Sequence, residues 1–276
     1  MGLPLVPPYR AGNSSKDFKL GANFAVGGAC ALDNAFFTAK VSNVTWTDYS
    51  LNTQLKWFEQ LLLRRFPSVH WSKAIVRKSL FFLGEMGVND YTHLLREKNG
   101  RDTINTYVPA VVHAIGSLVN NLIHRGAKAV VVSGIIPMGC LPAFLTSFQT
   151  QIATEYDPKT GCLTWLNELA KSHNLQLQNE LGRFRKVHPE VKIFYADYYY
   201  SMMPFFNNPE RLGFKEAMVA CCGGGGPYNF SLSAICGSPT SSLCSDPSSY
   251  VSWDGVHLTE AACSIVAREI LRGFQR

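Results

Sequence analysis

A carboxylate and an imidazole lie three residues apart near the end of the chain, in the stretch SYVSWDGVHLTEAA at 249–262. At this spacing the Asp254 carboxylate can reach the Nδ1–H of His257, which fixes the tautomer and makes Nε2 the nitrogen that takes a proton. Such an imidazole can activate a nucleophile. The alternative is that Asp254 caps a turn and His257 is a half-buried packing residue. The six other histidines lie in expected helices or polar loops and are interpreted as structural or solvated.

Two further stretches carry groups that could stabilise a developing oxyanion. In NFAVGGACAL (23–32), Gly27 and Gly28 follow an apolar run, so their backbone N–H groups can approach a bound group without a Cβ in the way. In FFLGEMGVNDY (81–91), Asn89 could donate a side-chain N–H, a strong electrostatic contribution to acyl transfer. Each has a structural alternative: tight packing for the glycines and an ordinary turn for Asn89.

The elements that must position these groups follow from the apolar pattern. Four runs are apolar almost continuously, as parallel strands buried on both faces are, and we expect strands at 21–26, 79–84, 127–136 and 191–199. Between and after them, apolar residues three or four apart predict helices within 49–66, 106–127, 165–187 and 259–274, the last with Thr259 as N-cap. The alternation predicts one doubly wound α/β domain over residues 1–276, with ligand sites at the carboxyl ends of the strands.

The composition argues against several classes of function. The formal net charge of +6 comes from scattered Lys and Arg without interleaved aromatic residues, so no nucleic-acid surface is expected. No apolar run approaches the roughly 20 residues of a membrane span. No cysteine pair has C-x-x-C spacing, and Gly223 to Gly226 are not followed by Lys-Ser/Thr, so neither a zinc site nor a phosphate cradle is expected. The sequence predicts no metal and no cofactor, and it leaves the oligomeric state open.

The cysteines and the sequons indicate an oxidising compartment. Five of the eight cysteines lie in Gly/Pro/Ser-rich loop sequence, where a buried thiol has little packing role, so disulfides are the favoured use. Three N-x-[ST] sequons make Asn13, Asn43 and Asn229 candidate glycosylation sites. The opening MGLPLVPPYR, however, lacks the basic and apolar regions of a signal peptide. Together these features favour a secreted protein whose signal is absent from these residues.

These separate features belong to an ordered set of five sequence blocks: NFAVGGA, GEMGVNDY, GIIPMGCLP, CCGGGGPYNF and WDGVHLTEAA. In order and spacing they resemble the plant GDSL esterase/lipase family of SGNH hydrolases over essentially the whole chain. The resemblance implies a flavodoxin-like three-layer α/β/α sandwich with a parallel sheet. It also implies a secreted hydrolase of small acyl, acetyl, phenolic or lipid esters, with a small-molecule ester as its partner.

Carried over to this sequence, the resemblance assigns roles to single residues. His257 would be the general base and Asp254 its orienting partner. Asn89 and the backbone N–H of Gly28 would form the oxyanion hole, with Gly27 as the fallback. Cys140 and Cys162 would form a disulfide that staples a loop, and the cysteines from 221 to 244 would hold the Gly-rich loop beside the site.

One block of the family is missing. The strand that ends in Gly-Asp-Ser and carries the nucleophilic serine has no counterpart in these 276 residues, and no G-x-S-x-G elbow replaces it. Ser133, before Gly134, lies in a block where the family does not place the nucleophile. We therefore expect a chain that is truncated at its N-terminus, lacks an inner strand and is inactive alone. The alternative is a non-catalytic product that binds acyl ligands or a partner.

Overall fold

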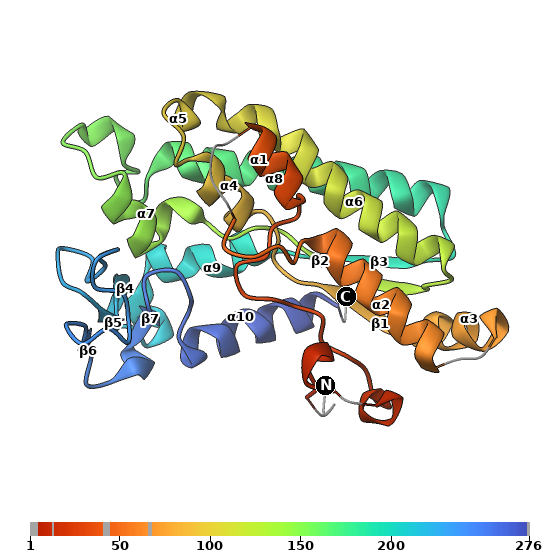
Figure 1. Ribbon diagram of the computed structural model, residues 1–276. Coiled ribbons are helices and arrows are strands. Elements are labelled where there is room, and N and C mark those ends of the chain that lie inside the picture. Colours follow the sequence, from red (N-terminus) through yellow and green to blue (C-terminus); the bar gives the residue numbers. More distant parts are fainter. Residues whose placement is uncertain (1–4, 13, 41–44, 66–67, 275–276) are drawn as a thin grey trace. The chain divides into compact units, whose positions relative to one another are not determined.

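The computed structural model describes residues 5–12, 14–40, 45–65 and 68–274. They divide into two compact units. Figure 1 labels the helices and strands of the chain. The first unit comprises residues 1–133 and 175–195, and the second comprises residues 134–174 and 196–276. The single-domain organisation stays a prediction.

The first unit is built on a three-stranded sheet of order β1-β2-β3, which consists of β1 (Leu80–Leu83), β2 (Ala129–Ser133) and β3 (Lys192–Ala196, the last residue belonging to the second unit). β1 and β2 pair in parallel, from Leu80 opposite Ala129 to Leu83 opposite Val132. The side chains of Val130, Val131 and Val132 are almost fully buried, as expected of a strand covered on both faces. Strands predicted at 79–84, 127–136 and 191–199 are confirmed, with shorter bounds.

The prediction of a strand at 21–26 is wrong. Within that range only Asn23 makes a bridge, in parallel with Pro8, through bonds from Tyr9 N to Asn23 O (2.7 Å) and from Asn23 N to Pro7 O (2.9 Å). Pro7 has no N–H to donate, which stops the ladder before the bridge, and the 3-10 turn Tyr9–Ala11 stops it after the bridge. An apolar run without a strand-forming neighbour therefore stays irregular.

Helices make up most of the rest of the first unit: α1 (Asn34–Lys40), α2 (Leu51–Arg65), α3 (Val69–Lys78), α4 (Val88–Leu94), α5 (Gly100–Thr103) and α6 (Val108–His124), with short 3-10 turns at Tyr9–Ala11, Ser15–Phe18 and Ile104–Tyr107. The apolar spacing that predicted α6 is confirmed, since Val111, Ile115 and Leu122 are buried. α2 packs against α6. By length and composition alone the helical stretch Gly100–His124 could cross a membrane, but a core helix passes the same test, and much of this one is buried.

The second unit combines short strands with helices. β4 (Glu216–Ala220) pairs in parallel with β7 (Tyr250–Ser252), and β5 (Cys222–Gly223) pairs antiparallel with β6 (Ser242–Leu243). Its helices are α7 (Pro142–Ser147), α9 (Tyr198–Asn207) and α10 (Glu260–Gly273), with 3-10 turns at Met138–Cys140, Ala153–Glu155, Pro209–Leu212 and Pro247–Ser249. α8 (Thr164–Val187) contributes residues to both units.

The core of the second unit gathers side chains from α9, α10 and β7 around a disulfide. Phe205 and Phe214 pack edge-to-face at 5.3 Å, and Val251 and Ala262 are buried in the same cluster with Cys140 and Cys162. α10 begins as predicted, because the side-chain oxygen of Thr259 accepts from the N–H of Ala262 and caps the first turn.

Three disulfides cross-link the second unit. Cys140 is joined to Cys162, the pair expected from the family resemblance, Cys221 to Cys244, and Cys222 to Cys236. The last two pairs enclose the Gly-rich segment, so the cysteines from 221 to 244 do hold that loop. Cys30 and Cys263 are not in disulfides: Cys30 is buried and Cys263 is exposed.

Candidate active site

His257 and Asp254 form a hydrogen-bonded pair in the turn between β7 and α10. Nδ1 of His257 lies 2.7 Å from Oδ2 of Asp254. The other carboxylate oxygen, Oδ1, accepts from the backbone N–H groups of Val256 (2.9 Å) and His257 (2.7 Å). Because an ionised carboxylate has only acceptors, Nδ1 carries the proton of the shared bond, and Nε2 is then the basic nitrogen of the neutral ring.

Backbone hydrogen bonds across the turn hold its two ends together. The N–H of Trp253 donates to the carbonyl of His257 (2.8 Å), and the N–H of Thr259 donates to the carbonyl of Val251 (2.9 Å). Gly255 has a φ of +94°, and its N–H donates to Ser252 Oγ (3.0 Å). A side chain at Gly255 would meet the ring of Phe230 at 2.4 Å. Only glycine therefore fits at this point of the turn.

The disulfide-braced segment packs along the strand that leads into the turn. The N–H of Cys221 donates to the carbonyl of Ser252 (3.0 Å), and the N–H of Cys222 donates to the carbonyl of Trp253 (2.7 Å). Each of these cysteines is also held by a disulfide. The residue just before Asp254 is thus tied to a cross-linked loop, which limits the movement of the turn.

The electrostatics of the pair suit proton transfer at the histidine. Burial raises the pKa of Asp254, but the hydrogen bonds from the His257 ring and from two backbone N–H groups outweigh it, so the pKa is lowered overall. The carboxylate is thus ionised at neutral pH and stabilises a positive charge on the ring. The His257 side chain is 75% exposed, whereas that of Asp254 is 24% exposed, so a reactant can approach the imidazole while its partner stays shielded.

The two predicted oxyanion residues both lie in the first unit, where Asn89 forms a hydrogen bond to the residue that follows Gly28. Gly28 has a φ of +79°, and a Cβ there would meet Trp46 at 3.2 Å, so the position requires glycine. Asn89, in the first turn of α4, donates through Nδ2 to the carbonyl of Ala29 (2.9 Å). An amide nitrogen carries two N–H groups, so a second donor remains for another acceptor.

Asp90 was missed as a site residue by the sequence reasoning. Its side chain is fully buried, and it accepts from the N–H groups of Ala31 (2.8 Å) and Leu32 (3.0 Å), directly after the Gly28 turn. No local signal in the sequence marks it, because Asp is mostly exposed in folded proteins and its two partners lie 59 and 58 residues away along the chain. The structure thus brings the site residues together in two groups, Asp254 with His257 and Asn89–Asp90 with the Gly28 loop.

The remaining candidates contribute little to such a site. Ser133 is buried at the end of β2, which does not favour a nucleophile. Asn229 uses its amide within the Gly-rich loop, donating to the carbonyl of Ala220 (2.8 Å) and accepting from the N–H of Gly225 (2.9 Å). Its glycosylation stays a prediction, and Asn13 and Asn43 lie outside the described residues. No cluster of three metal-ligating side chains occurs within the described ranges.

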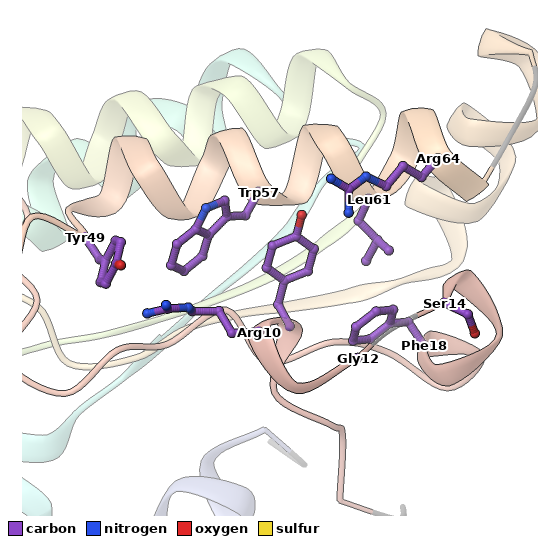
Figure 2. Close-up of a pocket in the computed structure, with 9 residues that line it drawn as sticks. Arg10, Gly12, Ser14, Phe18, Tyr49, Trp57, Leu61 and Arg64 are labelled. Atoms are coloured by element: carbon purple, nitrogen blue, oxygen red, sulfur yellow. The ribbon is translucent and has the colours of Figure 1, made fainter.

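A cavity of about 450 Å³ in the first unit is lined by other residues (Figure 2). The guanidinium of Arg10 lies 4.7 Å from the ring centre of Tyr49, and the ring of Trp57 forms part of the same wall. Neither Gly28 nor Asn89 lines this cavity. This cavity is therefore not the predicted oxyanion site.

Known proteins resemble the chain over nearly its full length. The sequence profile of the family described as GDSL-like Lipase/Acylhydrolase matches residues 1–270. GDSL esterase/lipase At1g28580 of Arabidopsis thaliana is 41% identical over 274 residues, and the sinapine esterase of Brassica napus is 43% identical over 275 residues. Each match covers 99% of this chain and 70% of the relative. The chain belongs to the GDSL-like lipase and acylhydrolase family, whose members are esterases with a parallel α/β sheet.

Proposed function

We propose that this chain supplies the acid–base and oxyanion parts of a serine ester hydrolase. The observation that carries the proposal is the 2.7 Å contact between His257 Nδ1 and Asp254 Oδ2, in a turn that leaves the imidazole exposed. A histidine oriented by a carboxylate is the base that a serine hydroxyl needs to attack an ester carbonyl. Small acyl, acetyl, phenolic or lipid esters are the proposed substrates.

The proposed mechanism has two half-reactions. The serine hydroxyl attacks the ester carbonyl while Nε2 of His257 takes its proton, and Asp254 stabilises the imidazolium that forms. The backbone N–H of Gly28 and the side-chain N–H of Asn89 donate to the oxyanion of the tetrahedral intermediate. His257 then protonates the leaving alcohol. In the second half, His257 takes a proton from water as the water attacks the acyl-enzyme, and His257 then gives this proton to the serine oxygen as the carboxylic acid leaves.

The serine itself is the missing part of this mechanism. The 276 residues contain no Gly-Asp-Ser sequence. We propose that they do not hydrolyse esters alone and that a polypeptide which also carries this block is active. The three disulfides support folding in an oxidising compartment, and we propose secretion for the same reason.

A labelling experiment tests the assignment. The purified chain is treated with a fluorophosphonate probe and assayed with a short-chain nitrophenyl ester and a hydroxycinnamoyl choline ester. We expect no labelled serine and no turnover, and labelling and turnover in a version that carries a Gly-Asp-Ser block ahead of residue 1. A labelled serine in the 276-residue chain, with turnover lost in the His257→Ala variant, would show that another serine acts as nucleophile. Saturable binding of the esters without turnover in both forms would favour the non-catalytic alternative.

A further inference from the structure

A half-exposed tryptophan lies beside the loop that contains Gly28. The side chain of Trp46 is 50% exposed, although tryptophan is highly buried on average in folded proteins. A Cβ built on Gly28 would lie 3.2 Å from Cβ of Trp46 and 3.6 Å from Cε3 of its indole ring. The ring is therefore next to the backbone of the residue whose N–H is the proposed oxyanion donor.

The backbone on both sides of Trp46 is held by Asn34, the first residue of α1. Oγ1 of the buried Thr45 lies 3.1 Å from Oδ1 of Asn34 and 2.8 Å from the carbonyl oxygen of Thr47. Nδ2 of Asn34 donates to Oδ1 of Asp48 (2.6 Å). One amide side chain thus fixes the residues before and after the tryptophan.

Two further side chains orient the indole ring. The ring of His93, in α4, has its centre 4.4 Å from that of Trp46 at an interplanar angle of 55°, and His93 is buried. The guanidinium of Arg96 lies 5.1 Å from the centre of the indole, in cation–π contact. Because the exposed part of the ring is already held in place, a ligand that packs against it costs little side-chain entropy.

The chemistry of such a ligand follows from this surface. An aromatic ring gains more against indole than its buried area alone provides, so Trp46 favours an aromatic group over an aliphatic one. The positive charge of Arg96 over the indole disfavours a cationic group at the same place. An ester whose carbonyl oxygen accepts from the N–H of Gly28 would bring one of its two substituents to Trp46.

We propose that Trp46 is a specificity-determining residue, which binds the aromatic group of an ester whose carbonyl lies at Gly28. The proximity of Trp46 to Gly28, together with the fixed and half-exposed ring, carries this inference. It rests on the proposed function for the role of Gly28. It narrows the proposed substrates to esters that carry a neutral or anionic aromatic group in their acyl or alcohol part.

Titration of the purified 276-residue chain with three neutral esters tests the proposal. Methyl cinnamate has an aromatic acyl group, benzyl acetate has an aromatic alcohol group, and methyl hexanoate has neither. Calorimetry measures the Kd of each ester for the wild-type chain, Trp46→Leu and Trp46→Phe. We expect Trp46→Leu to weaken the binding of at least one aromatic ester about tenfold and that of methyl hexanoate less than about twofold. Trp46→Phe should restore most of the loss, and the ester that responds identifies the part recognised.

Trp57→Leu is the matched control, because Trp57 lines the cavity of Figure 2 and Trp46 does not. This change should leave the three Kd values as they are. The proposal would be overturned by equal affinities of the wild-type chain and Trp46→Leu, by a loss in Trp57→Leu alone, or by the absence of saturable binding of both aromatic esters. If Trp46→Leu does not fold, nuclear Overhauser contacts between the ester's ring protons and the Trp46 indole of the wild-type chain decide.

Failure of this proposal is distinguishable from failure of the proposed function. Binding that does not depend on Trp46 would leave the esterase proposal standing, because the fluorophosphonate experiment does not involve this residue. A version with a Gly-Asp-Ser block that is neither labelled nor active would overturn the esterase proposal, whatever the Kd values are. In an active version, Trp46→Leu should lower kcat/KM for the responding aromatic ester about tenfold and that for methyl hexanoate less than about twofold.

Discussion

Gly255 shows how strictly single positions are specified around the His257 turn. Its backbone has a φ of +94°, and a Cβ would lie 2.4 Å from a ring carbon of Phe230. We expect Gly255→Ala to lower the free energy of unfolding by about 3 kcal/mol, because backbone strain and overpacking add. Urea unfolding measures the loss.

Gly213 offers the matched control for that change. Its φ of +86° imposes the same backbone strain, but a Cβ there would meet nothing within 4 Å. Gly213→Ala should therefore lower the free energy of unfolding by about 1 kcal/mol. Equal losses at the two glycines would show that Phe230 does not restrict position 255.

His257 is the residue on which the proposed chemistry depends most. In a version that carries a Gly-Asp-Ser block, we expect His257→Ala to lower kcat by about three to six orders of magnitude, since the serine would lose its base. The control is His113→Ala, on the exposed face of α6, which should leave kcat unchanged. Steady-state kinetics with a nitrophenyl ester compares the two. An active His257→Ala variant would exclude the mechanism.

At the scale of elements, β1 is an edge strand of the described sheet. It pairs with β2 on one side, and the side chains of Leu80 and Phe82 are about half exposed (49% and 52%). An exposed apolar edge is a site for aggregation. We expect Phe82→Lys to slow aggregation of the purified chain at raised temperature, followed by light scattering. Leu175→Lys, on the exposed face of α8, removes a similar apolar surface without an edge and should slow it less.

The longer elements were predictable from the sequence because their burial is regular. Val111, Ile115 and Leu122 recur at helical spacing in α6, and the valines of β2 form an unbroken apolar run. The strand at 21–26 failed because strand formation depends on a neighbour, which here is the proline pair before Tyr9. β4 and β7 were not predicted because neither is part of a long unbroken apolar run: β4 begins at Glu216, and β7 has three residues and ends at Ser252.

The candidate site was predictable only where its contacts are local. Asp254 and His257 are three residues apart, so their spacing alone predicts the bond that the structure contains. The contacts of Asp90 with Ala31 and Leu32 span 59 and 58 residues along the chain. Spacing in the sequence carries no information about such long-range bonds, and the contacts of Asp90 became visible only in the structure.

At the scale of the whole molecule, buried titratable groups set the pH dependence of stability. Burial lowers the pKa of His173 to about 3 in the folded chain, against about 6.5 when unfolded. Its contribution to stability is complete above pH 6.5 and is lost as the pH falls toward 3, by about 1 kcal/mol per pH unit. Asp90 acts in the opposite sense, because its raised pKa makes its contribution decline as the pH rises through about 7.

Replacing His173 tests its contribution to the pH dependence of stability. Between pH 6.5 and pH 4.5, the wild-type chain should lose more unfolding free energy than His173→Gln, by about 2 kcal/mol over the interval. Urea midpoints at several pH values measure it. His113→Gln, at an exposed position, should follow the wild-type curve. Parallel curves for His173→Gln and the wild-type chain would show that His173 is not kept neutral by the fold.

The bonds that define the His257–Asp254 pair all close between residues 253 and 257: Nδ1 to the carboxylate, two backbone N–H groups to the same carboxylate, and the N–H of Trp253 to the carbonyl of His257. A loop this short costs little entropy to close. The proposed base and its orienting acid are thus encoded within five consecutive residues. A single short deletion would therefore remove the proposed base and its orienting acid together, whereas the proposed nucleophile does not belong to this segment.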